Sequence, residues 1–334
     1  MKSKFLSALQ DKEKGLFPVW IMRQAGRYLP AYQNLKKKHS LKELFKNPKL
    51  AAKTMLLPFE TLSLDAAILF SDITLVLEAL GCEVDFLEGK GPWVTRPDKL
   101  KLLPHAFCYT QEILQISRSF LQVPTIGFCG GPFTVLCYFL NDRYPYRKLR
   151  AFLQEEPRTA LLYLEMITEA SFAFIKAQEK EGIAAFQIFE SHFDLLASKE
   201  LEVFCFPFLQ KLCEKVNIPL ILYVPGGENH LEKIASFPID ALGITHKADV
   251  KKIRKILPPS ISLQGNFDVS KLFLPKEEFF PEVEKMLQDF EEEPGYIVNL
   301  SEGIWPNVPF SKVQSFVECV HNYAKRRSTL SGTF

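Results

Sequence analysis

The sequence lacks the features that mark membrane, fibrous and nucleic-acid-binding proteins. Within its 334 residues, no segment approaches the roughly 18 consecutive apolar residues of a membrane-spanning helix. No repeat, low-complexity tract or long Pro/Gly/Ser linker is present. A formal net charge of +2 gives no excess of basic residues of the kind that binds nucleic acid. These absences predict a globular protein without nucleic-acid or membrane partners.

Paired cysteine motifs are lacking as well. Seven cysteines occur, none in a C-x-x-C pair, and their odd number leaves at least one unpaired. In a chain of this length, free thiols are typical of a reducing compartment. The N-terminal stretch MKSKFLSALQDKEKG has too short an apolar core for a secretory signal, and acidic residues follow closely. We therefore expect a cytoplasmic protein.

The sequence does contain an alternation of strand-like and helix-like segments. Eight short apolar runs have the length and composition of buried strands: Phe17–Met22, Ala66–Phe70, Thr125–Phe128, Ala184–Phe189, Leu220–Val224, Ala241–Ile244, Ile261–Leu263 and Tyr296–Val298. Helical patterns lie between and after them: Pro48–Ser63, Phe133–Leu140, Leu149–Glu181, Leu196–Val216, Val250–Leu257, Pro275–Glu292 and Ser311–Lys325. Eight such units predict an α/β fold, a single (β/α)8 barrel that forms one catalytic domain over residues 1–334.

Two of these segments carry further expectations. Leu149–Glu181 is long enough for two helices, and Glu83–Leu87 has the pattern of a small extra strand. Polar residues or glycines follow every predicted barrel strand, among them Ser71, Gly130, Gly131, Glu190, His192, Gly226, Thr245, His246 and Asn266. Barrel enzymes build their active sites from the loops at these strand ends, so the pattern predicts a pocket there.

The stretch PVWIMRQAGRYLP, residues 18–30, places two arginines directly after the first apolar run. Arg23 and Arg27 are separated by Gly26, which permits a backbone turn. Arginine is the side chain best suited to gripping carboxylates or phosphates through two parallel hydrogen bonds. Two solvated surface arginines near a turn are the alternative. The polar residues at the other strand ends favour a place in the pocket.

Several motifs together resemble the uroporphyrinogen decarboxylase family of haem biosynthesis. The first is PVWIMRQAGRYLP, which is highly specific. The others follow in the family's order and span nearly the whole chain: FSDI (70–73), GFCGGPFTVLCY (127–138), FQIFESH (186–192), LQGNFD (263–268) and NLSEGIWP (299–306). The family fold is a single (β/α)8 barrel, which agrees with the strand pattern.

The resemblance implies a carboxy-lyase that removes CO2 from four acetate side chains of uroporphyrinogen III and leaves methyl groups, giving coproporphyrinogen III. It also implies a homodimer, with uroporphyrinogen as the small-molecule partner. By matching the family's motifs, it assigns substrate-binding roles to Arg23, Gln24, Ala25, Gly26, Arg27, Asp72, Tyr138, Ser191 and Glu302.

The resemblance assigns catalysis to Asp72, Arg23 and Tyr138. Asp72 would receive the pyrrole N–H groups and stabilise a cationic ring, although it could instead cap the helix that begins ITLVLEAL. Tyr138 would help to position Asp72 and substrate, or be a core tyrosine with a satisfied hydroxyl. Ser191 would contact substrate or cap a turn. The proton donor stays open, with Arg23 favoured for orienting the acetate.

No metal or organic cofactor is expected, because a protonated pyrrole supplies its own electron sink. A zinc- or corrinoid-linked methyltransferase of a related barrel is one alternative. It would need converging thiolate and imidazole ligands. The sequence offers His105 and Cys108 three positions apart, but no H-x-C motif followed by a distant cysteine.

A barrel that binds tetrapyrroles without catalysis is the other alternative, because two strand ends depart from the family. GITH (243–246) stands where relatives have GLDW, and NLSEGI stands where relatives have NLGHGI. The second change puts Glu302 in the place of a pocket histidine. An ionised Glu302 would repel the carboxylates of the substrate. We therefore expect Glu302 to be protonated, turned away or paired with His246, and pairing would make the two changes compensate.

Overall fold

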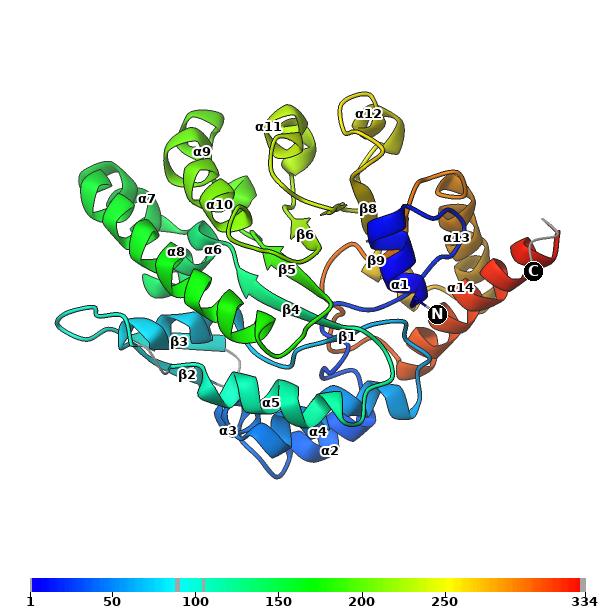
Figure 1. The fold of residues 1–334 in the computed structure, drawn as a ribbon, viewed down its shortest axis with the longest axis horizontal. Helices are drawn as coiled ribbons and strands as arrows, with labels where there is room; N and C mark the ends of the chain where they lie inside the picture. Colours follow the sequence, from blue (N-terminus) through cyan, green and yellow to red (C-terminus); the bar gives the residue numbers. More distant parts are fainter. Residues whose placement is uncertain (1, 88–90, 104–105, 331–334) are drawn as a thin grey trace.

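The computed structural model describes residues 2–87, 91–103 and 106–330, in which a curled parallel sheet of seven strands carries helices on its outer face (Figure 1). Its strand order is β1-β4-β5-β6-β7-β8-β9. The strands are β1 Ala67–Ile68, β4 Thr125–Gly130, β5 Ala185–Phe189, β6 Leu220–Tyr223, β7 Ala241–Gly243, β8 Ser262–Phe267 and β9 Ile297–Leu300. Each overlaps a run that the sequence predicts, although β4, β8 and β9 extend beyond the predicted ends, and the fold is a TIM barrel.

The first predicted strand, Phe17–Met22, is wrong in extent. It is reduced to one parallel bridge between Val19 and Val298 of β9. On its other side, the Asp65 N–H donates to the Val19 carbonyl over 2.8 Å, so this segment closes the circle between β9 and β1. A ladder does not extend further because Pro18 has no N–H to donate. Positive φ angles at Phe17 (46°) and Arg23 (66°) also turn the chain away at both ends.

Helices follow the strands as the sequence predicts, with additional ones near the N-terminus, before β4 and before β7. They are α1 Lys4–Leu6, α2 Pro30–Lys36, α3 Leu41–Lys46, α4 Pro48–Leu56, α5 Cys108–Arg118, α6 Pro132–Phe139, α7 Arg147–Glu155, α8 Pro157–Glu179, α9 Ser198–Phe204, α10 Phe206–Cys213, α11 Leu231–Ala235, α12 Val250–Arg254, α13 Lys276–Asp289 and α14 Phe310–Leu330. The long predicted stretch does hold two helices, α7 and α8, because Pro157 starts a new one. Within the described ranges, no helix is long and apolar enough to cross a membrane.

A hairpin outside the barrel joins β2 Glu83–Leu87 to β3 Gly91–Thr95 in antiparallel register. The sequence predicts β2 correctly, but it gives no sign of β3. The Asn141 side chain accepts from the Val94 N–H over 2.8 Å and donates to the Val94 carbonyl over 2.7 Å. The hairpin is therefore fastened to the loop that follows α6.

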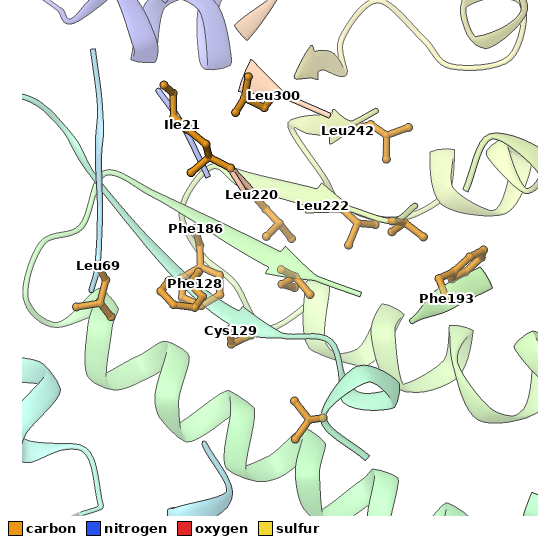
Figure 2. Packing of buried hydrophobic residues seen from close by; sticks show 14 of the residues in the cluster. Ile21, Leu69, Phe128, Cys129, Phe186, Phe193, Leu220, Leu222, Leu242 and Leu300 are labelled. Atoms are coloured by element: carbon orange, nitrogen blue, oxygen red, sulfur yellow. The ribbon is translucent and has the colours of Figure 1, made fainter. Parts of the chain in front are cut away.

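Two apolar cores support the barrel. The larger one surrounds the sheet, and Figure 2 shows Phe186, Leu220, Leu222 and Leu242 from successive strands within it. The smaller one fills the inside of the barrel. It reaches from α1 and the turn after it, at the amino-terminal end, to Met22 and to Tyr223, the last residue of β6. Its members are Phe5, Ala8, Leu9, Trp20, Met22, Ala66, Ile126, Ala185, Ile221, Tyr223, Ala241 and Ile297. Because this core occupies the amino-terminal end, an open cavity is expected at the carboxyl ends of the strands.

Candidate active site

A cavity of about 1130 Å³ opens at the carboxyl ends of the barrel strands. Its wall is built from the loops that follow the strands, as expected for a barrel enzyme. All nine residues with a predicted substrate-binding role lie on this wall: Arg23, Gln24, Ala25, Gly26, Arg27, Asp72, Tyr138, Ser191 and Glu302. The fold therefore brings together residues that are up to 279 positions apart in the chain (302 − 23).

The two arginines present free guanidinium groups to the cavity. Neither the Arg23 nor the Arg27 side chain makes an ion pair or hydrogen bond within the described part of the chain. Arg23 has a φ of 66°, a left-handed conformation that costs a residue with a Cβ about 1–2 kcal/mol. The surrounding structure must therefore hold Arg23 in this conformation.

Glycines shape the path of Arg23. A Cβ at Gly303 would lie 2.8 Å from the Arg23 Cδ, so the arginine side chain rests directly on that glycine. A Cβ at Gly26 would lie 2.7 Å from the Arg23 carbonyl oxygen. Gly26 therefore permits the backbone turn that the sequence predicts, and this turn folds back on Arg23.

Gln24 is 1% exposed and faces the cavity with an unsatisfied donor. Its Oε1 accepts from the Ile21 N–H over 3.5 Å, whereas its Nε2 has no partner in the described structure. The hydroxyl of Ser71, also on the cavity wall, is likewise buried without a partner. An unpaired buried donor costs free energy, so both groups are suited to a ligand that accepts hydrogen bonds.

Asp72 serves the fold with one oxygen and faces the cavity as well. It is the N-cap of the 3₁₀-helix Ile73–Leu80, and its Oδ1 accepts from the Thr74 N–H over 2.9 Å and from the Thr74 hydroxyl over 2.5 Å. Oδ2 makes no hydrogen bond to any described residue. Burial raises the pKa of Asp72, while the Thr74 hydrogen bonds and the positive charge of Arg23 oppose that rise. The capping alternative is thus correct for one oxygen and leaves the other free.

Tyr138, near the end of α6, is not a core tyrosine with a satisfied hydroxyl. It lies on the cavity wall, and its hydroxyl bonds to no described residue. The ring meets His192 edge-on, with centroids 5.4 Å apart and an interplanar angle of 84°. Burial raises the pKa of Tyr138, and the nearby Asp72 adds to the rise, so the phenol is neutral and can donate a hydrogen bond.

The FESH segment divides between the cavity and the protein interior. Ser191 faces the cavity, whereas Glu190 is fully buried behind it. The Glu190 carboxylate accepts from the N–H groups of Phe133 (3.2 Å) and Thr134 (2.7 Å). A Cβ at Gly131 would lie 2.2 Å from Glu190 Oε2, so this glycine permits close packing.

Of the three alternatives for Glu302, the pair with His246 is wrong. His246 Nε2 lies 4.0 Å from an oxygen of Asp268, and its Nδ1 lies 3.4 Å from the Ser301 hydroxyl. Glu302 is exposed on the cavity wall and forms no ion pair with any residue the structure describes. The turn after β9 directs Ser301, rather than Glu302, toward the histidine.

Sequence reasoning missed part of the wall. Phe189 and Tyr223, the last residues of β5 and β6, face the cavity with their ring centroids 5.9 Å apart. Alternation along a strand could have found them, because side chains of the final residues point either into the barrel or away from it. Asp194, Glu228 and Lys247 also line the cavity from loops that carry no periodic signal.

Ligands for a metal are not gathered in the described ranges. No group of three or more His, Cys, Asp and Glu side chains there is arranged to hold a metal ion. Cys108 is an exposed thiol at the start of α5, and its proposed partner His105 lies outside the described residues.

Comparison with known proteins gives consistent matches over nearly the whole chain. A family model described as Uroporphyrinogen decarboxylase (URO-D) matches residues 1–323. A uroporphyrinogen decarboxylase from Desulfotalea psychrophila is 35% identical over 335 residues, 96% of this chain and 98% of the relative. One from Protochlamydia amoebophila is 36% identical, covering 95% and 91%. A solved methyltransferase from Methanosarcina mazei, 23% identical, has a TM-score of 0.77 over 96% of this chain and 98% of its own, a likeness of fold alone.

Proposed function

The chain belongs to the uroporphyrinogen decarboxylase family, and on that premise we propose that it decarboxylates the four acetate side chains of uroporphyrinogen III to give coproporphyrinogen III. This is a carbon–carbon lyase reaction of haem biosynthesis. The observation that supports it most is the cavity itself. One wall places a carboxylate with a free oxygen, Asp72, near the free guanidinium group of Arg23.

The arginines and their neighbours bind the substrate in this proposal. Uroporphyrinogen carries eight carboxylates, and Arg23 and Arg27 each offer a planar group that can bind one of them through two hydrogen bonds. The unsatisfied Nε2 of Gln24 supplies a further donor. The aromatic rings of Phe189 and Tyr223 give the macrocycle an apolar wall.

The chemistry uses the substrate as its own electron sink. A proton adds to the ring carbon next to the one that bears the acetate, which makes the pyrrole cationic. The bond between the acetate methylene and its carboxylate then breaks, and its electron pair moves into the ring as CO2 leaves. A proton adds to the methylene carbon to give methyl, and the ring carbon loses its proton. Arg23 orients the reacting carboxylate, and no metal or organic cofactor takes part.

Asp72 stabilises the cationic ring in this scheme. Its free oxygen accepts pyrrole N–H groups, whose positive charge grows as the ring is protonated. At about 4 Å and an effective dielectric constant near 20, a pair of unit charges contributes roughly 4 kcal/mol. If that interaction exists only in the transition state, it corresponds to about three decades in rate. Tyr138 offers its neutral hydroxyl beside Asp72 and the substrate.

An anaerobic assay with uroporphyrinogen tests the proposal. We expect intermediates with seven, six and five carboxylates, followed by the four-carboxylate product. Oxidised uroporphyrin is the matched control. It should not turn over, because its planar ring cannot direct four N–H groups toward one carboxylate. Tetrapyrrole binding without any loss of CO2 would overturn the proposal in favour of a non-catalytic barrel, and activity that requires one added metal would overturn the cofactor-free scheme.

We further propose that the enzyme is a cytoplasmic homodimer with one catalytic domain over residues 1–334. All seven cysteines are free thiols, which is typical of proteins in a reducing compartment. Sedimentation of the purified protein tests the dimer, and a single species with the mass of one chain would contradict it.

A further inference from the structure

Glu190 is a buried carboxylate that the proposed chemistry does not use. It follows the last residue of β5, is 0% exposed and is not part of the cavity wall. It accepts from two backbone N–H groups at the start of α6, those of Phe133 and Thr134, and from the Thr134 hydroxyl. A buried carboxylate is costly unless such donors surround it. These donors also lie at the positive end of the α6 dipole.

A chain of contacts leads from Glu190 to the cavity. Thr134 donates its hydroxyl to Glu190, and the same hydroxyl oxygen accepts from the His192 N–H over 3.0 Å. Tyr138 lies four residues beyond Thr134, on the same face of α6. The His192 ring packs edge-on against Tyr138, and its Nε2 lies 2.9 Å from the Tyr146 hydroxyl. Glu190 therefore fixes both α6 and the imidazole against which Tyr138 rests.

We propose that Glu190 is a positioning residue that holds Tyr138 at the cavity wall through Thr134 and His192. This inference rests on the proposed function, in which the Tyr138 hydroxyl acts on the substrate and Asp72. Glu190 itself touches neither, because it is buried behind the wall. Losing it should therefore displace Tyr138 without removing any group that binds substrate.

The surroundings of Glu190 determine its ionisation. Its titratable neighbours in the described structure are the His192 ring, linked through Thr134, and four buried thiols: Cys129 on β4, Cys137 on α6, Cys205 between α9 and α10, and Cys213 on α10. Burial raises the pKa of each thiol and lowers the pKa of His192, so these groups are neutral and offer the carboxylate no positive charge. Burial likewise raises the pKa of Glu190 to about 7, against the hydrogen bonds from Thr134 and Phe133.

A double-mutant cycle between Glu190→Gln and Tyr138→Phe tests the inference. In Glu190→Gln, the amide keeps the shape but lacks the charge and turns an NH2 toward a backbone donor. We expect kcat for uroporphyrinogen to fall about tenfold, with KM changed less than about twofold, because only the placement of Tyr138 changes. In the Tyr138→Phe background, the same substitution should change kcat by less than about twofold.

Thr134→Val gives a second route if Glu190→Gln fails to fold. It removes the hydroxyl that links Glu190 to His192. We expect a similar fall in kcat, which should again be nearly absent in the Tyr138→Phe background. Thr168→Val is its matched control, because Thr168 is also buried and donates to the Leu164 carbonyl over 2.7 Å within α8, away from the cavity wall. This control should lower the thermal midpoint without lowering kcat.

The possible outcomes separate the two proposals. If Glu190→Gln and Thr134→Val lower kcat equally with and without the Tyr138 hydroxyl, the positioning role is wrong and the proposed decarboxylation stands. If either leaves kcat unchanged in a folded enzyme, the positioning role is also wrong. If Tyr138→Phe alone leaves kcat unchanged, the catalytic role of Tyr138 fails, and the positioning role falls with it.

Discussion

At the scale of single residues, Asp72 divides its two oxygens between folding and chemistry. Oδ1 caps the 3₁₀-helix through Thr74, while Oδ2 stays free of protein partners at the cavity. The cap holds the carboxylate in one rotamer, so the oxygen that faces the substrate is fixed before the ligand arrives. Substituting Asp72 therefore affects both stability and turnover, and the two effects must be separated by a control.

Asp72→Asn is expected to fold and to lose at least about two decades in turnover. The amide oxygen can still accept from Thr74, but the negative charge opposite the developing cation is gone. Circular dichroism and the anaerobic assay measure the two effects. Asp268→Asn is the matched control, because Asp268 caps the 3₁₀-helix Val269–Phe273 through the Ser270 N–H in the same way but does not line the cavity. Near-normal turnover of Asp72→Asn would reduce Asp72 to a helix cap.

Glu190 should make the stability of the protein depend on pH. Its folded pKa of about 7 lies above the ordinary value of 4.5, so folding favours the protonated acid. That contribution is fully present below pH 4.5 and is lost as the pH rises through about 7. At 1.36 kcal/mol per pKa unit, the loss amounts to about 3 kcal/mol. Urea unfolding at pH 5 and pH 8 measures it.

Glu190→Gln should flatten this pH dependence, because the amide does not titrate. Glu112→Gln, at an exposed position in α5, is the control and should leave the slope unchanged. A slope that survives Glu190→Gln would assign the pH dependence to other groups.

At the scale of elements, the sequence predicts the barrel well wherever an apolar run is long enough to pair along its length. Seven of the eight predicted runs contain strands of the sheet, and α7 and α8 separate at Pro157 as expected. The exception is Phe17–Met22. Positive φ angles at Phe17 and Arg23 limit its pairing to a single bridge, and composition does not reveal such angles. Helices α1, α2, α3, α5 and α11 were missed. Four of them span only three to seven residues, which is too short for a periodic pattern to be distinctive. The fifth, α5, spans 11 residues and buries Thr110, Ile113, Leu114 and Ser117 at helical spacing, so its pattern could have been found.

The same distinction applies to the site. Motif residues such as Arg23 and Asp72 could be placed on the wall, because strand ends meet at one face of a barrel. The partner of His246 could not be predicted. Whether a histidine meets Glu302 or Asp268 depends on the direction of side chains in two loops, which spacing along the sequence does not determine.

The N-terminal segment acts as an element that plugs the barrel, and Phe5→Ala should show it. Phe5 is fully buried in the smaller core and belongs to α1, which covers the amino-terminal end of the barrel. Removing the ring should lower the free energy of unfolding by about 3–5 kcal/mol. KM for uroporphyrinogen should be unchanged, because the plug lies at the opposite end from the cavity. Phe120→Ala, at a position that is 63% exposed, is the control and should cost far less.

If Phe5→Ala instead raised KM while stability stayed the same, the barrel floor would be coupled to substrate binding and the plug interpretation would be wrong. Chemical denaturation and initial rates on the same preparation distinguish these outcomes.

At the scale of the whole molecule, the cavity gathers charges of both signs from loops around the barrel. Its cationic side chains are Arg23, Arg27, Lys247 and Lys252, and its carboxylates are Asp72, Asp194, Glu228, Asp249 and Glu302. Besides burial, Glu302, Glu228 and Asp194 all raise the pKa of Tyr223, so these three acids surround one aromatic side chain. In the proposed complex, the carboxylates of uroporphyrinogen should therefore point toward the arginines and away from these acids, while the macrocycle rests on the Tyr223 ring.

Glu302→Gln should lower KM for uroporphyrinogen, because it removes a charge that repels the substrate. Unscreened repulsion between Glu302 and a substrate carboxylate at about 4 Å would cost roughly 4 kcal/mol at an effective dielectric constant near 20. Solvent screens the exposed Glu302, so we expect KM to fall only about three- to tenfold. Added salt should shrink the difference between Glu302→Gln and the native enzyme. Because His246 lies beside Asp268 rather than Glu302, the effects of His246→Ala and Glu302→Gln should add within about 0.5 kcal/mol. A coupling well above that value would mean that substrate binding brings the two side chains together, and that they compensate for each other after all.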